Sequence, residues 1–123
     1  MITSYRELRV WQSADELAHK VFDLTGRFPK EYLYDLTSQL RRAALSVPTN
    51  IAEGCASLHT KEFIQFLNIS RRSLSETRYL LDFAFRRALV EAEEFKALET
   101  LVDDTGKMTN SLLRSLTSKS TKH

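Results

Sequence analysis

The longest uninterrupted helical pattern in the chain starts at His59 or Thr60 and continues to about Leu89. Apolar and small side chains recur there at alternating steps of four and three residues. This spacing is typical of the seam of a left-handed helical bundle. The seam consists of Phe63, Leu67, Ser70, Leu74, Thr77, Leu81, Ala84 and Ala88. A chain organised around such an element is expected to fold as a helical bundle.

A second apolar stripe lies beside this seam and widens the apolar arc well beyond the roughly 100° that one core requires. Its members are Phe66, Ile69, Leu80 and Phe83, with Ile64, Phe85 and Leu89 on the far flank. Either this helix is central and nearly surrounded, or part of it contacts another subunit. For a chain of this size the second alternative is more economical. We therefore predict an oligomer interface at Phe66, Ile69, Leu80 and Phe83.

Ser73 and Glu76 interrupt the second stripe. A carboxylate among apolar side chains requires a cation, and Arg41 or Arg42 is the candidate partner for Glu76. The alternative is that Glu76 reaches water at the rim of the apolar surface.

The segment Ser38 to Gly54, SQLRRAALSVPTNIAEG, combines a helical period with a proline. Its buried face is predicted to contain Leu40, Ala43, Ala44, Val47 and Ile51. Pro48 removes a backbone donor, so the helix should kink near Ser46 or stop at Val47. We expect a kink, because the apolar phase continues to Ile51 and Gly54 suits the left-handed conformation that ends a helix.

Two further amphipathic patterns flank these helices. The first is predicted to end between Gly26 and Pro29, and the last follows the acidic turn Val90 to Glu94. Their apolar faces contain Leu8, Trp11, Ala14, Leu17, Ala18, Val21, Phe22 and Leu24, and then Phe95, Leu98, Leu101, Val102, Thr105, Met108, Leu112, Leu113 and Leu116. Tyr32 and Tyr34, in the first connection, either stack on nucleic-acid bases or cover the end of the bundle.

The length of 123 residues, with 42% hydrophobic residues, three Gly and two Pro, fits one helical domain. Four amphipathic helices with short connections predict an all-α, antiparallel up-down-up-down bundle whose second helix is kinked at Pro48. We place this domain at residues 1–117 and expect residues 118–123 to form a disordered basic tail.

The location expected from the sequence is the cytoplasm. The single cysteine, Cys55, cannot form an internal disulfide, which fits a reducing compartment. The N-terminus does not resemble a secretion signal, and no apolar run approaches the roughly 20 residues of a membrane span. We expect no membrane partner.

The chain offers little that resembles an active site. His19 lies one turn from Asp15 and Asp23, which suits a solvated helix face better than catalysis. Cys55 and His59 are four residues apart but lie on either side of a predicted helix break. No inward-projecting set of carboxylates and histidines is predicted, and no phosphate-binding glycine loop occurs. We therefore expect no catalytic residue, no metal, no cofactor and no enzymatic activity.

Arginine is the remaining functional signal, although the formal net charge is only +2. Its guanidinium group forms paired hydrogen bonds with phosphate or carboxylate. Arg41, Arg42, Arg71, Arg72, Arg78, Arg86 and Arg87 concentrate on the two central helices. If several subunits repeat these arginines around an axis, their electrostatic fields add and the assembly is expected to bind the phosphates of nucleic acid. If the arginines pair with Glu53, Glu62, Glu76 and Asp82, the protein is instead an interaction module.

The motif SQLRRAALSVPTNIAEG, which includes Pro48, Asn50, Glu53 and Gly54, resembles the signature of the four helix bundle protein family. This family is also known as the 23S rRNA intervening-sequence protein family. The likeness continues in LRVWQSADELAHKVFDLTGRFPKEYLYDLTSQ, KEFIQFLNIS and the SLSE run, and it covers about four fifths of the chain. The sequence departs from the usual pattern at Cys55 to Leu58 and at Arg72, Ser73 and Arg78.

The resemblance implies a homopentamer of bundles. It also implies a relation to accessory proteins of diversity-generating retroelements, which bind nucleic acid and a reverse transcriptase. The leading hypothesis is a non-enzymatic, homo-oligomeric scaffold for RNA or DNA, with a reverse transcriptase or another nucleic-acid enzyme as a possible partner. Arg41 and Arg42 would contact phosphate, assisted by Arg71, Arg72 and Arg78. The alternative is a protein interaction module without nucleic-acid binding.

Overall fold

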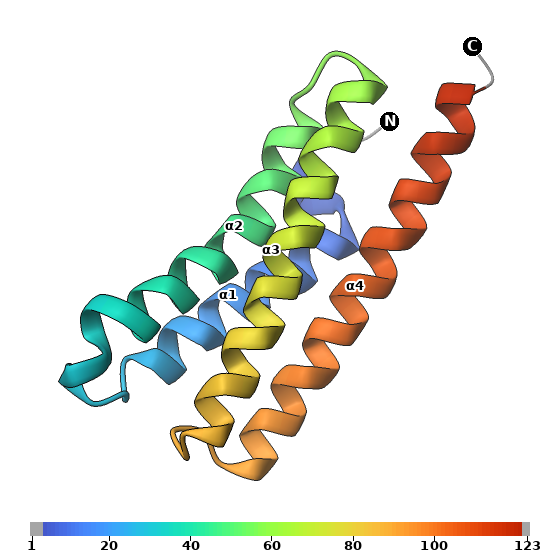
Figure 1. Ribbon diagram of the computed structural model, residues 1–123. Coiled ribbons are helices and arrows are strands. Elements are labelled where there is room, and N and C mark those ends of the chain that lie inside the picture. Colours follow the sequence, from blue (N-terminus) through green and yellow to red (C-terminus); the bar gives the residue numbers. More distant parts are fainter. Residues whose placement is uncertain (1–3, 122–123) are drawn as a thin grey trace.

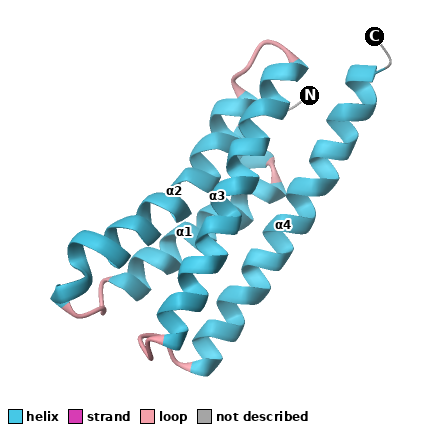
Figure 2. Cartoon of the chain, in the orientation of Figure 1, coloured by secondary structure: helices cyan, strands magenta, loops and turns pink. Residues whose placement is uncertain are grey.

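The computed structural model describes residues 4–121, and four long helices dominate this part of the chain (Figure 1). The helices are α1 (Arg9–Thr25), α2 (Ser38–Cys55), α3 (Thr60–Arg86) and α4 (Ala92–Thr121). Short helical turns precede α1 (η1, Tyr5–Glu7) and α2 (η2, Lys30–Tyr32, and η3, Leu33–Thr37). Residues 4–121 contain no strand, as Figure 2 shows.

Successive helices run in opposite directions, and each packs on its neighbours. Helix α1 contacts α2 and α4, and α3 contacts the same two helices from the other side. This arrangement confirms the predicted antiparallel up-down-up-down bundle. None of the described helices is long and apolar enough to cross a membrane.

The core contains most of the predicted apolar faces of the four helices, but Phe22 is 37% exposed. Leu17, Leu40, Leu67 and Leu98 are fully or almost fully buried. Residues with hydroxyl groups are also buried; Thr77 Oγ1, for example, donates to the Ser73 carbonyl at 2.8 Å. Within the described part of the chain, no buried side-chain nitrogen or oxygen lacks a hydrogen bond.

Helix α2 continues through Pro48, so termination at Val47 is excluded. The carbonyl groups just before the proline accept additional side-chain hydrogen bonds. Thr49 Oγ1 donates to the Leu45 carbonyl at 2.8 Å, and Ser70 Oγ on α3 donates to the Val47 carbonyl at 2.9 Å. Side-chain donors of this kind support a helix that contains an interior proline. The kink itself stays a prediction from the chemistry of proline.

Gly54 does not end α2 in the expected way, because the helix continues to Cys55 and no glycine of residues 4–121 has a positive φ. The reason for glycine is steric. A Cβ atom at Gly54 would lie 2.7 Å from Phe63 Cδ1 and 3.2 Å from Phe66 Cβ. The absent side chain therefore lets the end of α2 approach the start of α3.

Helix α3 ends at Arg86, three residues earlier than predicted. Ala88 adopts φ 63°, in the left-handed region, and thereby reverses the chain. The Leu89 N–H donates to the Ala84 carbonyl and the Ala88 N–H donates to the Phe85 carbonyl. This pair of bonds is the Schellman motif, here with alanine where glycine is usual.

Helix α4 extends to Thr121, past Thr117, where we had placed the end of the folded domain. Residues 118–121 of the expected disordered tail are thus helical, and Lys122 and His123 lie outside the described residues.

Candidate nucleic-acid interface

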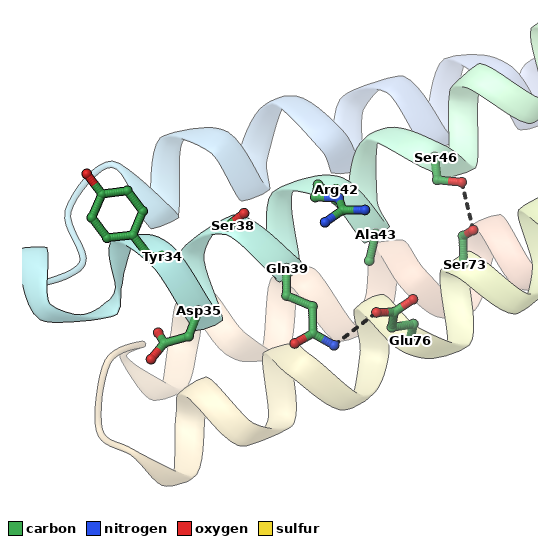
Figure 3. A pocket seen from close by; sticks show the side chains of 9 residues that line it. All are labelled: Tyr34, Asp35, Ser38, Gln39, Arg42, Ala43, Ser46, Ser73 and Glu76. Atoms are coloured by element: carbon green, nitrogen blue, oxygen red, sulfur yellow. Dashed lines mark hydrogen bonds between the residues drawn. The ribbon is translucent and has the colours of Figure 1, made fainter.

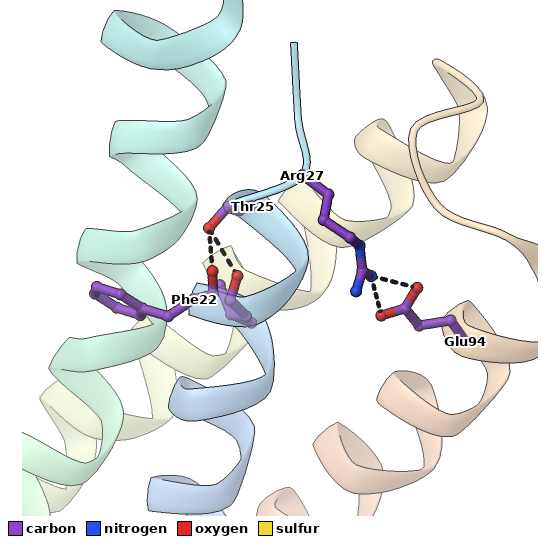
Figure 4. Close-up of polar contacts among 5 residues, drawn as sticks. Phe22, Thr25, Arg27 and Glu94 are labelled. Carbon is purple, nitrogen blue, oxygen red and sulfur yellow. Dashed lines mark hydrogen bonds and ion pairs between the residues drawn. The ribbon is translucent and has the colours of Figure 1, made fainter. Parts of the chain in front are cut away.

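Arg41 and Arg42 have different environments. Arg41 Nε donates to Thr25 Oγ1 at 2.7 Å, and its NH2 group donates to the Phe22 carbonyl at 3.2 Å. The guanidinium group also lies 4.7 Å from the centre of the Phe22 ring. Thr25 Oγ1 in turn donates to the Val21 and Phe22 carbonyls at 2.8 and 3.3 Å (Figure 4). Arg41 therefore caps the C-terminal end of α1, and this role opposes the predicted phosphate contact.

Three other arginines form ion pairs. Arg78 pairs with Asp103 at 2.5 Å and links α3 to α4. Arg86 pairs with Asp82 at 2.9 Å within α3. Arg27 binds both oxygens of Glu94 at 2.6 and 2.8 Å (Figure 4). Arg78 is thus less available to phosphate than predicted.

Of the four acidic partners expected for the arginines, only Asp82 pairs with one in residues 4–121. Glu53 and Glu62 form no ion pair within this range, and Glu76 accepts a hydrogen bond from Gln39 Nε2 at 3.2 Å. Glu76 therefore does not pair with Arg41 or Arg42 within the protomer, and a pair across an interface stays a prediction. The exposed position of Glu76 agrees with the alternative that it reaches water.

Arg42, Arg71 and Arg72 are exposed and have no hydrogen bond or ion pair with any residue that the structure describes. Arg42 lies on α2, and the other two lie near the middle of α3. A free guanidinium group keeps its full capacity for paired hydrogen bonds to an anion. These three side chains are the available part of the predicted arginine set.

Arg42 lines a polar groove of about 580 Å³ between α2 and α3 (Figure 3). Ser73 Oγ donates to Ser46 Oγ at 2.8 Å at one end of the groove, and the Gln39–Glu76 bond crosses its middle. The lining residues are Tyr34, Asp35, Ser38, Gln39, Arg42, Ala43, Ser46, Ser73 and Glu76. Hydroxyl, amide and guanidinium groups give this groove the chemistry of a site for a polar ligand.

A second groove, of about 460 Å³, shares Asp35, Gln39 and Glu76 with the first and has a more apolar lining. It reaches Tyr32, Leu36, Tyr79, Leu80, Phe83 and Arg87. The Arg87 guanidinium donates to Tyr32 Oη at 3.2 Å, and this bond raises the pKa of Arg87. Tyr32 is half-buried, whereas Tyr34 is 93% exposed. Only Tyr32 thus covers the end of the bundle.

The predicted interface residues divide into two groups. Ile69 and Phe83 are 37% and 36% exposed, and Phe66 is half-buried. Leu80 is only 5% exposed and packs in the core of the protomer, so it offers little surface to the predicted interface. Sequence reasoning missed Tyr79 and Leu45, which are 58% and 50% exposed. Leu45 lies on α2, so the stripe of α3 gave no signal for it, whereas Tyr79 precedes Phe83 by four residues and continues that stripe.

The signature residues of α2 have structural roles. Asn50 Nδ2 donates to the carbonyl and to Oγ of Ser46, at 2.8 and 2.9 Å, and Ser46 Oγ also accepts from Ser73. Pro48 and Gly54 are buried, and Glu53 is exposed. Asn50 and Ser46 thus connect the proline-containing turn to α3.

Cys55 and His59 form no hydrogen bond with one another in the described part of the chain. Partial burial raises the pKa of the Cys55 thiol, which is the opposite of what a reactive thiolate requires. Among the described residues, no group of three His, Cys, Asp or Glu side chains is placed to hold a metal ion.

These features define a small antiparallel helical bundle with a polar groove and unpaired arginines on its two central helices. The chain belongs to the 23S rRNA-intervening sequence protein family, whose profile matches residues 6–111. A crystal structure of a protein of unknown function from the S23 ribosomal protein family of Bacteroides thetaiotaomicron has the same fold, with a TM-score of 0.79. The two chains are 23% identical over 85% of this chain and 95% of the other. No curated protein matches the sequence.

Proposed function

We propose that this protein is a non-enzymatic, homo-oligomeric scaffold that binds nucleic acid in the cytoplasm. The observation that carries this proposal is the presence of three exposed arginines, Arg42, Arg71 and Arg72, without partners among the described residues. Phosphate groups are the ligands that such side chains suit best when no carboxylate competes for them.

Self-association would increase the affinity of these arginines for nucleic acid. The formal net charge of one chain is only +2, so a single copy attracts a polyanion weakly. Several copies around an axis would place their arginines along one strand of nucleic acid and add their contributions. The exposed side chains Ile69 and Phe83 supply apolar surface for such an assembly. We propose five copies by likeness to the family, with a reverse transcriptase or another nucleic-acid enzyme as the partner.

The test is an anisotropy titration of a labelled single-stranded RNA at several salt concentrations. In the Arg42→Ala, Arg71→Ala, Arg72→Ala variant the affinity should fall at least about tenfold, and the salt dependence should weaken by about 0.7 per lost phosphate contact. The matched control, Arg78→Ala with Arg86→Ala, removes two ion-paired arginines and should bind nearly as wild type.

The second candidate is a protein interaction module without nucleic-acid binding. Tyr79 and Phe83 favour it, because their exposed rings lie 6.4 Å apart along the apolar groove and form a surface suited to a protein partner. Wild-type protein that leaves RNA anisotropy unchanged at low salt would favour this alternative and contradict the first proposal.

A further inference from the structure

Tyr34 is the most exposed large hydrophobic side chain among the described residues, at 93%, and it lies at one end of the polar groove (Figure 3). The neighbouring Tyr32 binds Arg87, but Tyr34 has no ring contact or hydrogen bond in residues 4–121. A tyrosine that contributes so little to the core presents both ring faces to a ligand. Aromatic rings in this situation stack on unpaired bases, whatever the base.

Tyr34, Ser38 and Arg42 follow one another at steps of four residues through η3 and α2, and they lie along one edge of the groove (Figure 3). With about 1.5 Å of rise per residue, the first and last are about 12 Å apart along the helix axis. This span exceeds the reach from a base to its own phosphate. A strand of at least two nucleotides would therefore join the two contacts.

The opposite edge of the groove has the opposite character. Asp35, Gln39 and Glu76 lie there, and the two carboxylates have no cationic partner among the described residues (Figure 3). Carboxylates repel phosphate, so they would confine a nucleic-acid backbone to the edge that contains Ser38 and Arg42. The charge distribution thus gives the groove one favourable path for a polyanion.

We propose that the edge formed by Tyr34, Ser38 and Arg42 binds single-stranded nucleic acid. One unpaired base stacks on the Tyr34 ring, the strand passes Ser38, and a neighbouring phosphate binds the Arg42 guanidinium group. A duplex cannot make the same contacts, because its bases are already stacked within the helix. This inference rests on the proposed function and adds to it a preference for single strands.

The test compares Tyr34→Ala, Tyr34→Phe and the control Leu58→Ala in titrations with a labelled single-stranded RNA and with the corresponding duplex. Tyr34→Ala should weaken single-strand binding about 5- to 100-fold, which corresponds to the loss of one stacked base. Tyr34→Phe keeps the aromatic ring and should bind as wild type. Leu58→Ala removes a side chain that is 91% exposed and lines neither groove, and it should have no effect.

The contrary outcomes separate this inference from the proposed function. If the triple arginine variant loses binding while Tyr34→Ala binds as wild type, the stacking contact is overturned and the proposed function stands. An equal loss with single strand and duplex, or a loss in Tyr34→Phe, also overturns it. If the wild-type protein binds neither RNA, both proposals fail. Tyr34 has few contacts to lose, so circular dichroism should show unchanged helix content in both Tyr34 variants.

Discussion

Arg41 and Arg42 illustrate how one step along a helix changes the role of a side chain. Successive residues of an α-helix project about 100° apart, with 3.6 residues per turn. Arg41 consequently faces α1 and binds Thr25 and Phe22, whereas Arg42 faces the groove beside α3. The sequence grouped the two arginines as phosphate ligands because nothing in it showed which of them faces α1.

This difference predicts that two single substitutions affect the free energy of unfolding differently. Arg41→Ala removes charged hydrogen bonds to the end of α1 and should lower the free energy of unfolding by about 1–2 kcal/mol. Arg42→Ala should leave this quantity unchanged within about 0.5 kcal/mol, because its side chain is exposed and unpaired. Urea denaturation followed by circular dichroism measures both values. Equal stability of the two variants would contradict the capping role of Arg41.

The sequence could predict an ion pair within one helix but not one between two helices. Arg86 and Asp82 are four residues apart on one helix, so their pairing follows from helical spacing. Arg78 instead pairs with Asp103 on α4, and this contact depends on how α3 and α4 are aligned along their axes. A sequence pattern gives the period of each helix but not that alignment.

At the scale of the element, the apolar period predicted the helices well and their ends less well. The seam of α3 is buried from Leu67 to Ala84, as the steps of three and four predicted. Its end at Arg86 depends on Ala88, a residue with no sequence signal for a left-handed turn. Leu80 and Phe83 belong to the same predicted stripe, but only Leu80 is covered, and it lines a groove together with Leu36.

The contact between the end of α2 and the start of α3 depends on Gly54. In Gly54→Ala the new methyl group would lie 2.7 Å from the Phe63 ring, so this variant should lose about 1–3 kcal/mol of unfolding free energy. Gly106→Ala is the control, because its Cβ would lie 3.6 Å from Leu74 Cδ2, an ordinary contact. Gly106→Ala should instead gain about 0.5–1 kcal/mol, the helix propensity difference.

Thermal unfolding of the two glycine variants separates these effects. The melting temperature should fall in Gly54→Ala and rise in Gly106→Ala. A rise in the melting temperature of both variants would mean that the Phe63 ring moves aside without cost. The close approach of α3 would then not explain why position 54 is a glycine.

At the scale of the whole molecule, the sequence predicted that α3 has more apolar surface than one chain covers. The exposed part of this surface consists of Ile69 and Phe83, and Tyr79 adds to it. Exposed apolar side chains along one helix favour association between copies. The number of copies depends on the angle between two contacting subunits. The apolar period of a helix does not specify that angle.

Negative charge on this apolar surface should prevent the association of copies. Ile69→Glu with Phe83→Glu places carboxylates at two exposed apolar positions and should reduce the particle to a single chain with unchanged helix content. Leu58→Glu is the control, since Leu58 is 91% exposed in the connection before α3 and its substitution should not alter the mass. A double variant with the wild-type mass would place the interface elsewhere.

The mass of the wild-type particle in solution is the most direct measurement of the central claim, that copies of this chain cover the exposed apolar side chains of α3. Light scattering coupled to size exclusion should give five times the chain mass of 14.2 kDa. A particle of 14.2 kDa that persists to high micromolar concentration would contradict the claim.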